Sequence, residues 1–315
     1  MRGAAAWAPA IRAASLGLLL AQAGCADPSG GCRVSLAATY PVAEPRGVIT
    51  VPVEIDRATV AMVVDTGARR SVLASGAASR LGLVGSPWLG TLLAGVGGSG
   101  PVHRDALISR LAFADYATGP GSLAIGDMDP VPGSGPAAEG LLGEDVLHRF
   151  DLEFDLPHGQ LRLYRVAGCG GRFLPWRTPY AAVPARLSWR RANLIVPVML
   201  NGQPMQAVLD TGATGVIVGA DAARRAGVTP AMLAADRPMK GRAAIGAGFT
   251  LVRHRFDALT VGPVQTGPTE LFVLGRALDE GDMLLGLAWL RRQPVWISYA
   301  TGQVFVALPH AGAAP

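Results

Sequence analysis

Two aspartates, Asp65 and Asp210, each follow an apolar run and precede a glycine turn, in the segments "MVVDTGARR" (62–70) and "AVLDTGATG" (207–215). Ionisable side chains are normally kept out of such places, because burying a charge is costly. The two positions are 210 − 65 = 145 residues apart, close to half of the 315-residue chain. Two carboxylates held in contact share one proton, so that one acts as a base while the other acts as an acid. Such a pair can activate a water molecule for attack on a carbonyl carbon.

The surroundings of the two aspartates repeat one sequence unit. Residues 51–65, "VPVEIDRATVAMVVD", align without a gap on residues 196–210, "VPVMLNGQPMQAVLD". Alternating apolar positions on either side of Asp56-Arg57 and of Asn201-Gly202 predict two β-hairpins. Each hairpin therefore carries its Asp-Thr-Gly at the end of an apolar strand.

The repeat continues farther along the chain. "AASRLGL" (77–83) matches "AARRAGV" (222–228), which predicts a short helix that ends at a glycine in each copy. Leu-Leu-Gly motifs that end at Gly143 and Gly286 lie within two further matching segments, 140–164 and 282–306. A repeat of this size indicates two homologous lobes. The predicted parts are an N-terminal lobe at 33–165, a connector at 166–190 and a C-terminal lobe at 191–309.

Two similar lobes around a pseudo-two-fold axis bring equivalent residues together at that axis. Asp65 and Asp210 would then face each other. The glycine of each motif permits the tight turn, and a buried threonine hydroxyl in each motif can bond across the interface to hold the two loops in register. The repeat therefore predicts one shared site rather than two separate ones.

Both halves resemble the retropepsin-like (retroviral-type) branch of the aspartic proteases, here in a duplicated, single-chain bacterial form. The resemblance covers about residues 45–306 and is carried by apolar-apolar-Asp-Thr-Gly-Ala at 63–68 and 208–213 and by the two Leu-Leu-Gly motifs. It implies a mainly β, bilobal fold of the pepsin and retropepsin type, with two homologous β-barrel-like lobes and short helices. An alanine follows each glycine where the pepsin branch generally has Ser or Thr, which favours the retropepsin branch.

The resemblance also implies a role for each motif residue. Asp65 and Asp210 would be the catalytic pair of an aspartic-type endopeptidase that hydrolyses peptide bonds through an activated water, without a cofactor. The two threonines would interlock the loops, and the Leu-Gly strands would cross behind them. The residues expected to shape the loops or contact the substrate are Thr66, Gly67, Ala68, Thr211, Gly212 and Ala213.

Glycine-rich segments follow each Asp-Thr-Gly at the distance where this family places the flaps that cover a substrate. They are "AGVGGSG" (94–100), with Gly97 and Gly98, and "AIGAG" (244–248), with Gly246. Both are flanked by candidate strands. Ordinary hairpin turns are the alternative interpretation of these glycines.

Composition limits the classes of partner. The chain is 50% hydrophobic and 16% charged, which supports a sizeable core. Its net charge of +5 comes from scattered arginines with a single lysine, and aromatics are only 6% of residues, so nucleic-acid binding is not expected. The five histidines show no spacing typical of a metal site. We expect an extended peptide or protein segment as substrate, and a monomer, because one chain carries both motifs.

The first 25 residues have the features of an export signal, with Arg2 and Arg12 before the apolar stretch "AASLGLLLAQA" and small residues before Cys25. "QAGC" resembles a bacterial lipobox, in which Cys25 would carry lipid and anchor an otherwise soluble body. Cleavage by an ordinary signal peptidase is the alternative. The protein is thus expected in the periplasm or as a cell-envelope lipoprotein, with secretion as the other possibility.

Cysteine parity bears on the same choice. Lipidation of Cys25 would leave Cys32 and Cys169 free to pair, whereas ordinary cleavage would leave three cysteines in an oxidising compartment. A disulfide between Cys32 and Cys169 would tie the N-terminal arm to the connector. Two other functions stay open at this point: a catalytically inactive peptide-binding module and a cell-envelope scaffold, each with the same fold. The intact motif in both lobes favours the enzyme, because a binding module does not need two facing carboxylates.

Overall fold

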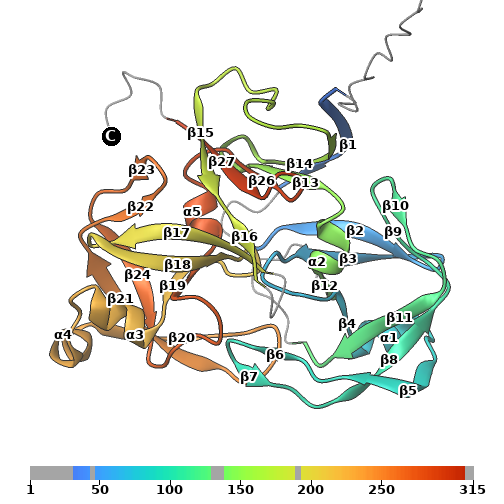
Figure 1. Cartoon of the computed structure of the whole chain (residues 1–315). Coiled ribbons are helices and arrows are strands. Elements are labelled where there is room, and N and C mark those ends of the chain that lie inside the picture. Colours follow the sequence, from blue (N-terminus) through green and yellow to red (C-terminus); the bar gives the residue numbers. More distant parts are fainter. Residues whose placement is uncertain (1–30, 43–46, 129–137, 189–192, 309–315) are drawn as a thin grey trace, which may run out of the picture. The chain divides into compact units, whose positions relative to one another are not determined.

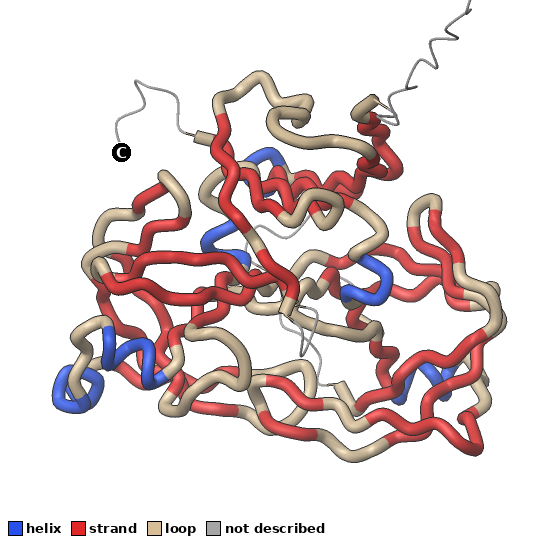
Figure 2. The backbone as a smooth tube through the Cα atoms, viewed as in Figure 1, coloured by secondary structure: helices blue, strands red, loops and turns tan. Residues whose placement is uncertain are grey.

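Repeated hairpins build the protein, as the sequence predicts. A computed structural model describes residues 31–42, 47–128, 138–188 and 193–308. The predicted export signal and Cys25 lie outside the described residues. From Cys32 onward the chain forms one compact unit. Strands dominate this unit, and the few helices are short (Figure 2).

The N-terminal lobe is built on a nine-stranded sheet. Its first hairpin pairs β2 (Thr50–Ile55) with β3 (Ala58–Val64), and Asp56 takes a positive φ of 54° in the turn. The strand order is β10-β9-β2-β3-β12-β4-β11-β8-β5. The remaining strands are β4 (Val72–Ala74), β5 (Gly85–Thr91), β8 (His103–Ile108), β9 (Leu111–Phe113), β10 (Tyr116–Ala117), β11 (Gly121–Gly126) and β12 (Gly140–Leu142).

The C-terminal lobe repeats this arrangement in a ten-stranded sheet. Its hairpin pairs β17 (Leu194–Leu200) with β18 (Gln203–Leu209), and Asn201 and Gly202 both have positive φ in the turn. The strand order is β20-β21-β24-β19-β25-β18-β17-β22-β23, with β16 paired to β17. The remaining strands are β16 (Arg186–Leu187), β19 (Val216–Val218), β20 (Arg237–Gly241), β21 (Phe249–Phe256), β22 (Leu259–Val261), β23 (Val264–Gln265), β24 (Thr269–Leu274) and β25 (Met283–Leu285).

The two Leu-Leu-Gly motifs form the strands that position the aspartates. β12 lies between β3 and β4, parallel to β3 and antiparallel to β4, and β25 lies in the same way between β18 and β19. The N–H of Asp65 donates to the carbonyl of Leu142 (3.0 Å), and that of Asp210 donates to Leu285 (3.2 Å). Both strands are fully buried, so each aspartate loop rests on core.

Short helices close the lobes. α1 and α3 end before Gly82 and Gly227, which have φ values of 65° and 90°, as the predicted glycine ends require. The helices are α1 (Ser75–Arg80), α2 (Glu144–Leu147), α3 (Ala220–Arg225), α4 (Pro230–Ala235) and α5 (Leu287–Leu290), with a 3₁₀ turn at Leu156–His158. No helix in the described part of the chain is long and apolar enough to cross a membrane.

A six-stranded sheet joins the lobes, with the order β1-β14-β13-β26-β27-β15 (Figure 1). Its strands come from both halves: β1 (Arg33–Pro41), β13 (Asp151–Asp155), β14 (Gln160–Ala167), β15 (Tyr180–Pro184), β26 (Val295–Ser298) and β27 (Gln303–Ala307). The predicted connector, 166–190, is therefore more than a linker, because β15 pairs with β27 along five residues. The predicted mainly β, bilobal fold is confirmed, while the shared sheet makes the lobe boundaries less sharp than the repeat suggests.

One disulfide secures this shared sheet at its edge. Cys32 and Cys169 are joined with an S–S distance of 2.08 Å, immediately before β1 and after β14. β1 and β14 also pair directly. The N-terminal arm is thus tied to the connector, at the position that cysteine parity indicates.

Candidate active site

The two Asp-Thr-Gly loops meet at the centre of the unit and interlock through their threonines. The N–H of Thr66 donates to Oγ1 of Thr211 (3.0 Å), and the N–H of Thr211 donates to Oγ1 of Thr66 (3.1 Å). Each hydroxyl donates in turn to a carbonyl of the other lobe, Thr66 to Leu209 and Thr211 to Val64, both at 2.7 Å. Both threonines are fully buried. Four cross-lobe hydrogen bonds therefore fix the loops against each other with two-fold symmetry.

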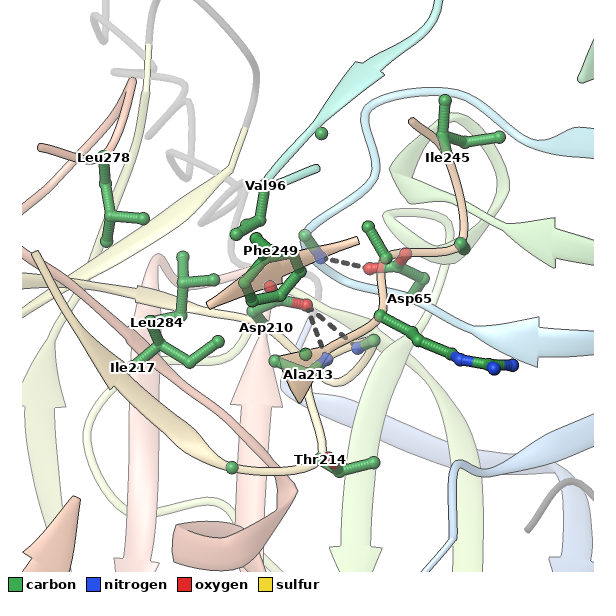
Figure 3. Close-up of a pocket in the computed structure, with 18 of the residues that line it drawn as sticks. Asp65, Val96, Asp210, Ala213, Thr214, Ile217, Ile245, Phe249, Leu278 and Leu284 are labelled. Carbon is green, nitrogen blue, oxygen red and sulfur yellow. Dashed lines mark hydrogen bonds between the residues drawn. The ribbon is translucent and has the colours of Figure 1, made fainter. Parts of the chain in front are cut away.

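The carboxylates of Asp65 and Asp210 lie on facing loops (Figure 3). One oxygen of each accepts N–H bonds from the glycine and alanine that follow it, at 2.9 and 3.0 Å in the first loop and 2.9 and 3.1 Å in the second. A methyl group on Gly67 would lie 2.5 Å from Cγ of Asp210, and one on Gly212 would lie 2.5 Å from Cγ of Asp65. Only glycine lets each backbone approach the opposite carboxylate so closely.

The electrostatics of the pair indicate a shared proton. Burial raises the pKa of Asp65, and the charge of Asp210 raises it further, against the lowering effect of the two N–H donors. Burial also raises the pKa of Asp210. The hydrogen bond between the two side chains raises the pKa of Asp65 but lowers that of Asp210. One carboxyl of the pair therefore holds a proton while the other carries the charge.

The two predicted flap segments meet over these loops. The first is the hairpin of β6 (Ala94–Gly95) and β7 (Gly98–Ser99), and the second is the loop between β20 and β21. Gly97 and Gly246 form a parallel bridge, and the N–H of Ala247 donates to the carbonyl of Gly97 (3.0 Å). A methyl group on Gly97 would lie 2.4 Å from the carbonyl oxygen of Ala247, while Gly98 and Gly246 have φ values of 101° and 90°. These glycines permit close contact between the tips.

An arginine adds a polar contact between the first flap and the opposite lobe. Nη2 of Arg276, two residues after β24, donates to the carbonyl of Val96 at 2.5 Å. Met128 takes the corresponding position two residues after β11 and cannot donate such a bond. Only the N-terminal flap has this contact among the described residues.

A cavity of about 770 Å³ lies between the flaps and the aspartates. Asp65, Asp210 and the glycine and alanine of both loops line it, together with residues of both flaps. Its apolar walls include Ile217, Phe249, Leu278 and Leu284 (Figure 3). The two aspartates and the glycine and alanine after each thus surround one space, which has room for part of an extended chain. The other predicted residues, Thr66, Thr211, Gly97, Gly98 and Gly246, do not line it.

Glu144 is a buried acid close to the site that sequence reasoning missed. It follows Gly143, and its N–H donates to the carbonyl of Ala68 (2.8 Å), while its Oε1 accepts from the hydroxyl of Tyr299 (3.1 Å). Burial raises the pKa of Glu144 to about 8; the Tyr299 hydrogen bond lowers it, and the charge of Asp65 raises it. An acid in the first turn of a helix usually suggests a solvated cap, and the one sequence signal for burial is that its repeat counterpart, Leu287, is apolar.

Asn193 is a second residue that the motifs do not predict. It lines the cavity, and its Nδ2 donates to the carbonyl of Gly67 (3.1 Å). In the ungapped repeat its counterpart is Val48, which also lines the cavity. The hydrogen bond therefore supports one aspartate loop only. No group of three or more His, Cys, Asp or Glu in the described residues is arranged to hold a metal ion.

Family comparisons match the two halves separately. The profile of a family described as "gag-polyprotein putative aspartyl protease" matches residues 196–292, and that of a family described as "Aspartyl protease" matches residues 51–146. Each range contains one Asp-Thr-Gly. The chain is a duplicated retropepsin-like aspartyl protease. The family predicted from the motifs is thereby confirmed.

Two solved structures similar to this retropepsin-like chain come from a fungus and a bacterium. The aspartic proteinase from Irpex lacteus is 13% identical, with 90% of this chain and 99% of that chain covered and a TM-score of 0.49. A retropepsin-like aspartic protease from Rickettsia conorii is 15% identical, with 42% and 96% covered and a TM-score of 0.34. A search of curated proteins finds no significant match.

Proposed function

We propose that this protein is an aspartic endopeptidase that hydrolyses peptide bonds through a water molecule activated by Asp65 and Asp210. The observation that carries the proposal is the matched hydrogen bonding of the two loops, which holds one protonated and one charged carboxyl at the floor of the cavity. A merely structural duplication gains nothing from burying two carboxyl groups against each other.

The chemistry follows from one proton shared by the pair, which we assign to Asp65 at the start of the cycle. Asp210 accepts a proton from a water molecule as the water oxygen bonds to the carbonyl carbon of the substrate, and Asp65 gives its proton to the carbonyl oxygen. The tetrahedral intermediate is thereby neutral. Asp210 then passes a proton to the amide nitrogen, the C–N bond breaks, and Asp65 recovers its proton as the new carboxyl group forms. The flaps exclude bulk water and hold the substrate as an extended strand.

The experiment is digestion of a mixed peptide library with the purified full chain at several pH values, followed by sequencing of the products. We expect internal cleavage at acid to neutral pH that survives chelators and thiol reagents. Binding without hydrolysis at every pH would instead favour the inactive peptide-binding alternative.

We further propose that one chain is the active unit, because both aspartate loops and both flaps belong to it. Specific activity should stay constant on dilution, and sedimentation should give a monomer. A steep loss of specific activity on dilution, together with a dimer peak, would contradict this proposal.

We also propose that the protein is exported, since the Cys32–Cys169 disulfide suits an oxidising compartment. Mass spectrometry of the mature protein tests both export and lipidation. A diacylglycerol adduct on Cys25 that disappears in Cys25→Ser is the expected result, and an intact N-terminal segment in the mature protein would contradict export.

A further inference from the structure

The two flap tips are equivalent in the fold but carry different side chains. Val96 precedes Gly97 in the first flap, Ile245 precedes Gly246 in the second, and the two glycines are bridged. Each side chain extends from its flap toward the opposite lobe. Val96 packs against the apolar cluster of the C-terminal lobe, which includes Val208, while Ile245 reaches the N-terminal lobe.

Ile245 closely occupies the N-terminal side of the groove. A methyl group added to Gly126 would lie 2.9 Å from Cδ1 of Ile245 and 2.7 Å from Cδ1 of Leu93. A methyl group added to Gly100 would lie 3.3 Å from Cγ2 of Ile245. The side chain is 8% exposed. Three N-terminal segments thus surround a side chain that the C-terminal flap supplies.

The cavity extends unequally toward the two lobes. In the C-terminal lobe, Ile217 and Phe272 pair on adjacent parallel strands, and both line the cavity. Their counterparts Val72 and Ala124 pair in the same way in the N-terminal lobe, and neither lines it. Val72 instead lies beside the volume that Ile245 and Leu93 fill. Free volume for a large side chain is therefore on the C-terminal side.

We propose that Ile245 closes the N-terminal subsite, so that the groove selects a bond between a small residue on the N-terminal side and a large apolar residue on the C-terminal side. This inference rests on the proposed peptidase function. The small residue would be Ala, Ser or Gly, because a larger one must displace Ile245. The large one would be Phe, Leu or Met, because its burial against Phe272 and Leu284 contributes favourable transfer free energy.

Binding of uncleavable ligands tests this inference apart from catalysis. Four peptides share the same flanks and carry a hydroxyethylene group in place of the scissile amide, with Phe/Phe, Ala/Phe, Phe/Ala or Ala/Ala at the two central positions. Their Kd values are measured with the wild-type full chain by titration calorimetry. One of the two mixed ligands should bind at least tenfold more tightly than Phe/Phe, and the better mixed ligand shows which direction the substrate chain takes.

Two variants give the matched comparison. Ile245→Ala should bring Phe/Phe to within twofold of the better mixed ligand. Val84→Ala shortens an exposed apolar side chain of the N-terminal lobe that does not line the cavity, so it should leave the tenfold difference unchanged. The inference is overturned if the wild type binds Phe/Phe as tightly as either mixed ligand, if Ile245→Ala leaves the difference unchanged, or if none of the four ligands binds. Ligands that bind in the expected pattern while their amide versions resist cleavage would overturn the peptidase function alone.

Discussion

The two lobes agree closely at their contact and differ around it. Hydrogen bonds of the threonines and of the aspartate carboxylates match between lobes to within 0.1 Å. The residues around these loops do not match. Arg70 in the N-terminal lobe bonds to Thr91 and to the buried Asp105, whereas its counterpart Gly215 lies against Phe272.

This contrast between matched loops and unmatched surroundings reflects two separate requirements on a duplicated chain, one from the chemistry and one from substrate recognition. Shared-proton chemistry needs equal geometry on both sides, so changes in either Asp-Thr-Gly loop would be disruptive. Substrate side chains impose no such equality. Once both halves lie in one chain, equivalent residues around the groove can differ between the lobes, as Ala124 and Phe272 do. Under the proposed function, the symmetric residues serve the chemistry and the asymmetric ones serve recognition.

The largest effect is expected from the symmetric carboxylates. Asp65→Asn and Asp210→Asn should each lower kcat by about 10³-fold or more, because either change removes one half of a unit that acts as a pair. Cleavage of a fluorogenic peptide measures this, with circular dichroism to show that each variant is folded. Turnover above a tenth of the wild-type value in either variant would contradict the dyad.

Thr66 and Thr211 should contribute equally to the unfolding free energy. Thr66→Val and Thr211→Val each remove a hydroxyl that donates one cross-lobe bond and accepts another, so each should cost about 2–4 kcal/mol of unfolding free energy. Urea unfolding measures the cost. Thr266→Val is the matched control, since its hydroxyl makes two bonds to Leu259 within one lobe. It should lower stability but leave kcat unchanged.

An inequality of more than about 1 kcal/mol between the two threonine variants would show that the two loops are not energetically equivalent, since that exceeds the few tenths by which the effects of independent sites depart from additivity. Unequal stability of the two threonine variants would also mean that the lobes differ at the Asp-Thr-Gly loops and not only around them.

Glu144 introduces a pH dependence that only the N-terminal lobe has, because its counterpart is Leu287. Folded Glu144 keeps its proton up to a pKa of about 8, while the unfolded chain releases it near the ordinary value of 4.5. The stability that it contributes is therefore complete below pH 4.5 and is lost as pH rises toward 8. The unfolding free energy of Glu144→Gln should therefore rise relative to that of the wild type over this interval, by at most about 1.4 kcal/mol per pH unit.

Unfolding free energies of the wild type and Glu144→Gln at pH 5, 6.5 and 8 measure this gain. Tyr299→Phe is the complementary variant. It removes a hydrogen bond that lowers the pKa of Glu144, so it should extend the pH-dependent loss to higher pH. A constant difference between wild type and Glu144→Gln across the range would show that Glu144 titrates alike in both states.

The sequence alone predicts much of the symmetric part. Repeated hairpins, the Asp-Thr-Gly loops and the Leu-Leu-Gly strands follow from local patterns that occur twice, and the pseudo-two-fold axis follows from the repeat itself. The shared six-stranded sheet does not follow, because pairing of β15 with β27 depends on long-range register that no local period encodes. The connector therefore looks like a linker in sequence.

The asymmetric part is also beyond local patterns. Ile245 stands in a glycine-rich segment whose flap role can be predicted, but its contact with Gly126 and Gly100 depends on how the two lobes meet. Glu144 has the sequence position of an exposed helix cap, yet it is buried and bonded to Tyr299, which follows β26 of the shared sheet. These side chains differ from their repeat counterparts, and mismatches within a repeat were the one available signal.

The smallest effect is expected at the arginine that holds one flap only. Arg276→Gln should raise both the association and the dissociation rate of a hydroxyethylene ligand about two- to fivefold, with little change in Kd. The bond to Val96 is exposed to solvent, so its loss is worth only about 0.5–1 kcal/mol of flap closure. Stopped-flow fluorescence measures both rates. Arg224→Gln, which removes an exposed arginine of the same lobe paired to Asp221, is the matched control and should change neither. Equal rates in wild type and Arg276→Gln would mean that the bridge at Gly97 and Gly246 alone sets the opening of both flaps, and that the flaps, unlike the walls, behave symmetrically.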